Sequence, residues 1–260
     1  MEIDREYDLE VENRRKELEE LAEDDANKVR DVIVAAILLY GAGFPSSKLL
    51  DTNKQKEFNK YIQNELKTTL KTNANWEEGI FISVFDRIAR NQNNNIDYYA
   101  KWVGNKTFRD RILANREKIA KYIEKSVKKN IKKDTKNLLS IVEEASKSTK
   151  KKQINHSLAL LRTETNRIVN RRELLDMIDK GYKKYVYCAI IDGRTSAICR
   201  SLDGNVYNIN EYMEGETAPP IHTNCRSYII GDEWHLMIEW LTELYVSKLI
   251  GFFEKQNSLK

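Results

Sequence analysis

The scarcity of helix-breaking residues before position 181 is the feature that most constrains this chain. Only four of its 10 glycines and one of its 3 prolines lie in that stretch. Because glycine and proline are the residues least compatible with helix interiors, long helices should dominate there. The other turn-forming residues gather in the last third. We therefore expect an α+β fold, with a long, mostly α-helical N-terminal region followed by a small module of a helix and about three antiparallel strands.

Apolar periodicity divides the helical region into segments. The expected helices cover about residues 4–40, 46–70, 76–88, 107–142 and 154–180, with Gly181 closing the last. The lysine- and serine-rich tract 147–152 is the best linker candidate. The expected division is a helical arm at 1–150, a C-terminal module at 151–231 and an amphipathic helix at 232–260.

Beyond Gly181 the pattern favours strands and turns. Strands are expected at 185–191, 205–209 and 225–230, and Thr195 or Ser196 can cap a short helix that ends near Leu202. Asp192-Gly193 and Asp203-Gly204 are turn signals between these elements. The module should therefore be a small, mostly antiparallel sheet backed by a helix.

Composition excludes several classes of protein. Three cysteines in 260 residues are too few for a disulfide scaffold and suit a reducing compartment. The longest apolar run, Val32 to Tyr40, is far shorter than the roughly 20 residues that span a bilayer. The acidic N-terminus is unlike a signal peptide, which favours a cytosolic origin.

The net charge of +4 is unevenly distributed. Residues 1–31 carry 13 acids against 6 bases, and residues 116–152 carry 13 bases against 5 acids. Each stretch is interpreted either as a solvated helix face or as a contact surface, the basic one for phosphates or an acidic partner. The candidate contacts to DNA or a partner are Lys121, Lys125, Lys128, Lys129, Lys132 and Lys133.

Cys199, His222 and Cys225 form the candidate metal set. Zinc takes three or four nitrogen and sulfur ligands, usually supplied as close pairs, and here only His222-x-x-Cys225 is such a pair. The alternatives are buried cysteines with a hydrogen-bonded histidine, or a nucleophilic cysteine paired with His222 and oriented by Asp192 or Glu164. No nucleophile elbow or glycine-rich phosphate loop supports catalysis.

Charged residues also gather where the helical pattern ends. They are interpreted as a polar network that fixes loop geometry, with Asp192 tightening its turn and Arg226 forking onto a carboxylate. The members of this expected network are Arg162, Glu164, Asp192, Arg194, Thr195 and Arg226.

Read together, the motifs between residues 155 and 231 form an ordered string. They are Arg162-Thr163-Glu164, an aromatic strand after Gly181, Asp192-Gly-Arg-Thr-Ser-Ala-Ile-Cys199, Leu202-Asp-Gly204 and Pro219-Pro-Ile-His222-Thr-Asn-Cys225-Arg-Ser227. This string strongly resembles the C-terminal domain of the phage Mu protein F-like family, the minor head or head morphogenesis proteins of tailed bacteriophages. Weaker similarity extends upstream to Trp102 and the basic helix.

The resemblance implies a non-enzymatic virion protein, made in the host cytoplasm and present in few copies in the capsid interior or near the portal vertex. Implied roles are head assembly, genome packaging or DNA ejection, with portal and major capsid proteins and packaged double-stranded DNA as partners and no small-molecule substrate. The alternatives are a toxin-like or hydrolytic enzyme using Cys199, His222 and Asp192, or a DNA-binding protein centred on the basic helix.

One departure from the family concerns its zinc-like set. Many members show Cys-x-x-Cys and a final Cys-Arg-Cys, whereas this chain has Ser196 and Ser227 at the extra positions. The joint absence of two thiols weakens the case for zinc, and hydrogen bonds are expected to replace ligation. No cofactor is therefore expected, with zinc at Cys199, His222 and Cys225 as the alternative.

Overall fold

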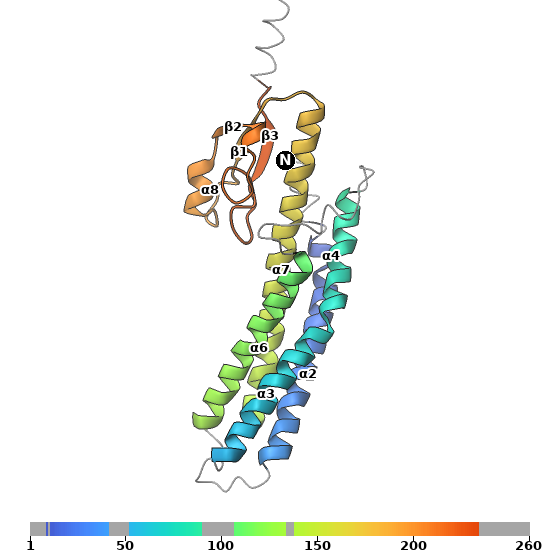
Figure 1. The fold of residues 1–260 in the computed structure, drawn as a ribbon, viewed down its shortest axis with the longest axis vertical. Helices are drawn as coiled ribbons and strands as arrows, with labels where there is room; N and C mark the ends of the chain where they lie inside the picture. Colours follow the sequence, from blue (N-terminus) through green and yellow to red (C-terminus); the bar gives the residue numbers. More distant parts are fainter. Residues whose placement is uncertain (1–8, 10, 42–51, 90–106, 134–137, 234–260) are drawn as a thin grey trace, which may run out of the picture. The chain divides into compact units, whose positions relative to one another are not determined.

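The computed structural model describes residues 9, 11–41, 52–89, 107–133 and 138–233 (Figure 1). It confirms the α+β prediction, with long helices followed by a small antiparallel sheet. The helices are α2 (Arg15–Gly41), α3 (Thr52–Thr72), α4 (Ala74–Ala89), α6 (Phe108–Lys133), α7 (Leu138–Asp179) and α8 (Ala197–Leu202). The strands are β1 (Lys184–Cys188), β2 (Val206–Asn208) and β3 (Tyr228–Gly231), and a 3-10 turn, η2, covers Ile209–Glu211.

The chain divides into two units, Met1–Thr165 and Asn166–Lys260, which we call the helical unit and the sheet unit. The boundary falls inside helix α7, which is continuous from Leu138 to Asp179. The linker expected at 147–152 was therefore wrong. That tract contains no glycine or proline, Thr149 is buried in it, and Lys150 reaches Glu23 of α2 at 2.5 Å. Lysine-rich sequence here is helix surface, because lysine is a good helix former.

The helical unit buries apolar side chains at helical spacing between α2, α3, α6 and the first turns of α7. Its main core contains residues from all four helices, which lie lengthwise beside one another in Figure 1. Representative members are Ile33, Ile62, Leu66, Ile123 and Val142. Apolar residues four positions apart along α6 belong to this core, namely Ile119, Ile123, Val127 and Ile131.

A buried ionic cluster joins three helices of this unit. Arg116 of α6 is fully buried and donates to Glu77 of α4 at 2.7 Å and to Asp25 of α2 at 3.0 Å. Asn73 donates to Asp25 at 2.9 Å, and Ser157 of α7 donates to Glu77 at 2.6 Å. One guanidinium thus faces two carboxylates away from water, and we call Asp25, Glu77 and Arg116 the buried triad.

The sheet unit begins with the end of α7, which stops where Gly181 adopts a φ of 81°. The amide of Tyr182 then donates to the carbonyl of Met177 at 2.9 Å, which satisfies the helix end as a glycine C-cap does. The sheet order is β2-β1-β3, and both pairs are antiparallel. Tyr185 and Tyr187 of β1 are buried, and Tyr185 packs with Met177 and Ile229.

Several expectations lie outside the described residues: the start of the first helix at residues 4–8, the start of the second at residues 46–51, Trp102, and nearly all of the C-terminal helix. All three strands differ from the expected bounds within the described part, and the largest shifts are the end of β1 at Cys188 and the start of β3 at Tyr228. No helix in the described ranges is both long enough and apolar enough to cross a membrane.

Candidate functional site

Helix α8 places Cys199 at the centre of the sheet unit's polar site. Ser196 is the N-cap, and its hydroxyl accepts a hydrogen bond from the Cys199 amide at 3.1 Å. The cap thus fixes the first turn of α8 at Cys199, whose thiol faces the other residues of the site. The Cys199 side chain is turned inward and is 3% exposed.

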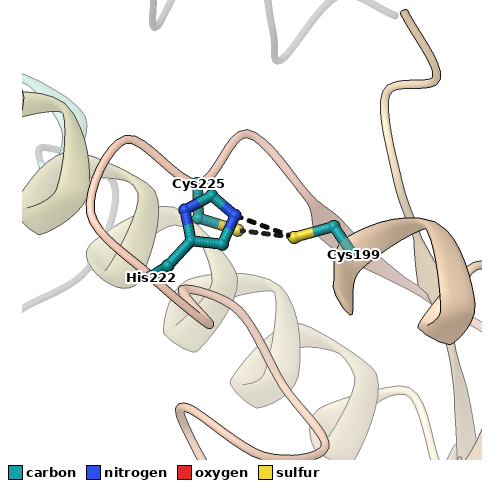
Figure 2. A group of neighbouring side chains, drawn as sticks. All are labelled: Cys199, His222 and Cys225. Carbon is teal, nitrogen blue, oxygen red and sulfur yellow. Dashed lines mark hydrogen bonds between the residues drawn. The ribbon is translucent and has the colours of Figure 1, made fainter. Parts of the chain in front are cut away.

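The loop before β3 supplies the other two side chains. His222 and Cys225 are joined by a tight turn in which the Cys225 amide donates to the His222 carbonyl at 3.2 Å. Asn224 between them has a φ of 62°, a left-handed conformation that asparagine tolerates better than most residues. This turn brings both side chains to the same side, facing Cys199 (Figure 2).

The three side chains converge closely. The Cys199 Sγ lies 3.1 Å from His222 Nε2 and 3.7 Å from Cys225 Sγ. All three ligand atoms lie within 4.8 Å of one another. Among the residues that the structure describes, this is the group of histidine, cysteine and carboxylate side chains close enough to hold a metal ion.

Hydrogen bonding favours a thiolate at Cys199. Burial raises the pKa of Cys199, but hydrogen bonds from Ser196, Ser227 and Tyr187 outweigh it and lower the pKa to about 7. Burial dominates at Cys225 and raises its pKa. Tyr187 donates to the Cys199 sulfur at 3.4 Å, and burial holds the pKa of Tyr187 far above its ordinary value. Of the two thiols, that of Cys199 therefore loses its proton before that of Cys225.

A second group of polar side chains shapes the loop beside these thiols. Asp192 accepts from Arg226 at 2.6 Å and from the Arg194 amide at 2.8 Å. The hydrogen bond from Arg226 is the main reason that the pKa of Asp192 lies well below its usual range. Thr195 closes the turn by donating to the carbonyl of Ile190 at 2.5 Å. Four of the six expected network residues thus meet in this loop.

The other two members of that expected set belong to the helical unit. Glu164 is buried and accepts two hydrogen bonds from Arg111 of α6, at 2.7 and 2.9 Å. The glutamate is therefore part of helix packing between α6 and α7. Arg162, two residues earlier on α7, is half-buried.

The lysines expected to contact DNA or a partner lie on α6. Lys121 and Lys128 form ion pairs within the helix, with Glu117 at 3.3 Å and Glu124 at 2.5 Å. Exposed positions in this set are Lys121, Lys125 and Lys129. The side chains of Lys132 and Lys133 lie outside the described part.

Sequence reasoning missed the side chains of α7 that hold the cysteine loop. Asn166 donates to the Ser227 carbonyl at 2.8 Å, and Asn170 accepts from the Ile229 amide at 2.9 Å. Arg167 donates to Glu214 at 2.7 Å, which ties the preceding loop to the same helix. The available signal was the spacing of Asn166 and Asn170, one turn apart on the helix face toward β3.

Replacing Asn170 by alanine should destabilise the sheet unit by about 2 kcal/mol, because the buried Ile229 amide would lose its acceptor. Urea denaturation would give the change in free energy of unfolding, and amide exchange at Ile229 should accelerate. Lys180→Ala, at the exposed position directly after the same helix, is the control and should change the free energy by less than about 0.5 kcal/mol. Unchanged protection of the Ile229 amide would contradict the assigned role.

Comparison with protein families finds a match to the model described as Phage Mu protein F like protein, over residues 114–230. Neither a search of curated proteins nor a search of solved structures finds a significant match. The matched segment covers most of α6, all of α7 and the sheet unit as far as Ile230. It therefore contains the motif string that suggested this family, together with Cys199, His222 and Cys225.

The match supports the class of phage head morphogenesis proteins. The matched segment includes most of the basic helix α6 together with the sheet unit. The motif string alone began later, near residue 155. Residues 114–230 thus match the phage Mu protein F-like family.

Proposed function

We propose that the protein is a non-enzymatic minor head protein of a tailed bacteriophage, which acts near the portal in head assembly, genome packaging or DNA ejection. The observation that carries this proposal is the family match over residues 114–230. The structure adds a scaffold suited to an assembly role, since a long helical unit is followed by a small unit cross-tied by polar side chains. The expected location is the capsid interior or the portal vertex.

The contacts of His222 differ from those of the enzymatic alternative in which Asp192 or Glu164 orients the imidazole. Its Nδ1 donates to the carbonyl of Thr223 at 2.8 Å, while Asp192 is held by Arg226 at 2.6 Å. A cysteine nucleophile with a histidine base needs a third group that orients the imidazole. Here a backbone carbonyl of the neighbouring residue fills that position, and Asp192 serves the turn instead.

Contacts to partners fall to the exposed faces of the helical unit. Lys125 and Lys129 lie one helical turn apart on α6 and are exposed, which suits phosphates of packaged DNA or an acidic surface of a portal or capsid protein. The nearby Lys150 is paired with Glu23, so the acidic and basic stretches partly neutralise each other within the unit. This leaves the lysines of α6 as the expected contact surface.

The test uses a phage that encodes this chain with an epitope tag. The tagged protein should appear in purified procapsids and virions at a small, fixed ratio to the portal protein. A phage carrying a stop codon early in the gene should produce fewer DNA-filled heads, and wild-type protein supplied in trans should restore them. Absence of the tagged protein from both procapsids and virions would refute the proposal.

A further inference from the structure

We propose that Cys199, His222 and Cys225 bind one zinc ion, with a fourth coordination position open to a small cavity. The inference concerns the sheet unit alone and does not depend on a role in the phage head. It rests on the spacing of the three ligand atoms, the tautomer of His222, the charge of the set and the cavity beside it.

The spacing fits a tetrahedral ion. Zinc–sulfur bonds of about 2.3 Å place two thiolates about 3.8 Å apart, and a zinc–nitrogen bond of about 2.0 Å gives a sulfur–nitrogen separation of about 3.5 Å. The structure has 3.7 Å between Cys199 Sγ and Cys225 Sγ, and 3.1 Å between Cys199 Sγ and His222 Nε2. A small shift of the half-buried imidazole would complete the match.

The imidazole is already set for ligation. A carbonyl oxygen can only accept, so the contact of 2.8 Å between His222 Nδ1 and the Thr223 carbonyl places the ring proton on Nδ1. The lone pair of Nε2 therefore points at the cluster (Figure 2). Histidine ligands of metals are commonly oriented by such a hydrogen bond from the other ring nitrogen.

Charge balance explains how a doubly charged ion could lie beside two buried thiols. Cys199 is 3% exposed and Cys225 is fully buried. Two thiolates and a neutral imidazole cancel the charge of Zn²⁺, so the loaded site has no net charge to desolvate. Tyr187 donates to the Cys199 sulfur and would support it as a ligand.

The fourth position lies toward a cavity of about 20 Å³, lined by Ser196, Cys199, His222, Asn224 and Ser227. A water molecule needs about 10–15 Å³, so the cavity has room for one. Ser196 and Ser227 therefore border the open side of the site. Three protein ligands with an exchangeable fourth are typical of an open zinc site, whereas closed structural sites have four protein ligands.

The experiment uses the full chain, purified under reducing conditions, stripped with a chelator and titrated with Zn²⁺ against a chromophoric competitor. Wild-type protein should bind about one equivalent. Titration with Co²⁺ should give the intense visible bands of a tetrahedral site and a near-ultraviolet sulfur-to-cobalt charge-transfer band. Both readouts use the wild-type protein, so neither depends on a variant that folds.

Variants then assign the ligands. Cys199→Ser and Cys225→Ser should weaken zinc binding at least 100-fold, and Tyr187→Phe by about 10-fold. Cys188→Ser is the matched control, because Cys188 lies on β1 outside the cluster and its thiol faces the Val186 carbonyl at 3.9 Å. Circular dichroism would confirm that each variant folds.

Three results would overturn the proposal. The first is that the wild type binds zinc no more tightly than Cys225→Ser does. The second is a weak cobalt spectrum, which is typical of octahedral coordination. The third is that Cys188→Ser loses as much binding as Cys199→Ser and Cys225→Ser. A Cys199–Cys225 disulfide that persists in the reduced preparation would also overturn it, because the thiolates would then be unavailable.

Discussion

Replacing Arg116 by methionine should destabilise the helical unit by about 3–5 kcal/mol at neutral pH, the loss typical of a buried ion pair deprived of one partner. Arg116 is fully buried and donates to both Asp25 and Glu77. Methionine fills much of the same volume but offers no donors. Two carboxylates would then face each other away from water, although Asn73, Ser157 and Gln153 would still donate to them.

Urea denaturation followed by far-ultraviolet circular dichroism would measure the change. Lys121→Met on the same helix is the matched control, because Lys121 is exposed and its pair with Glu117 lies at the surface. The control should change the free energy of unfolding by less than about 1 kcal/mol. A further change of Asp25 to asparagine in the Arg116→Met background should recover part of the loss, since it removes one of the two buried charges.

A loss below about 1 kcal/mol in Arg116→Met would show that the triad contributes little beyond packing. Failure of the Asp25 change to recover any stability would show that the carboxylates do not repel each other in the variant. Either result would contradict the view that Arg116 holds three helices together by charge.

The local signals in the sequence account for most of the sheet unit. Gly181 was expected to close a helix and does so with a φ of 81°. Ser196 was one of two expected caps for α8, and its hydroxyl holds the Cys199 amide. Such features depend on a few neighbouring residues, so a pattern of adjacent residues is enough to predict them.

Contacts between distant segments could not be predicted in this way. Asp25, Glu77 and Arg116 lie in charge-rich stretches, and nothing beside them separates a buried ion from a solvated one. Similarly, the sequence supplied Cys199, His222 and Cys225 as residue types, but their convergence depends on a cap, a left-handed Asn224 and the contacts of α7 with the strand β3. The expected linker failed for a related reason, because Lys150 gains partners on another helix.

The contribution of Asp25 to the stability of the helical unit should fall as the pH rises from about 4 to about 6. Burial raises the pKa of Asp25 from 3.8 to about 6, with Arg116 lowering it and Glu77 raising it. Between these values the folded chain keeps a proton on Asp25 that the unfolded chain has released. The folded state then binds more protons than the unfolded state, so the free energy of unfolding decreases with pH across this window.

A shift of about two pH units corresponds to about 3 kcal/mol. Other carboxylates act in the opposite direction, since the pKa of Asp24 and that of Glu117 are lowered by lysine partners. The contribution of Asp25 is therefore measured as the difference in free energy of unfolding between Asp25→Asn and the wild type. Asp25→Asn cannot titrate, so its free energy of unfolding relative to wild type should rise by about 3 kcal/mol between pH 4 and pH 7.

The matched control is Asp31→Asn, an exposed carboxylate on the same helix. Its stability curve should run parallel to that of the wild type over the same range. Parallel curves for Asp25→Asn as well would mean that Asp25 stays ionised in the folded protein. The guanidinium of Arg116 would then outweigh burial, and the triad would carry a net negative charge throughout this range. If the stability curves of Asp25→Asn and the wild type diverge as predicted, one guanidinium does not neutralise two buried carboxylates. Below pH 6 a proton on Asp25 then neutralises the remaining negative charge of the triad.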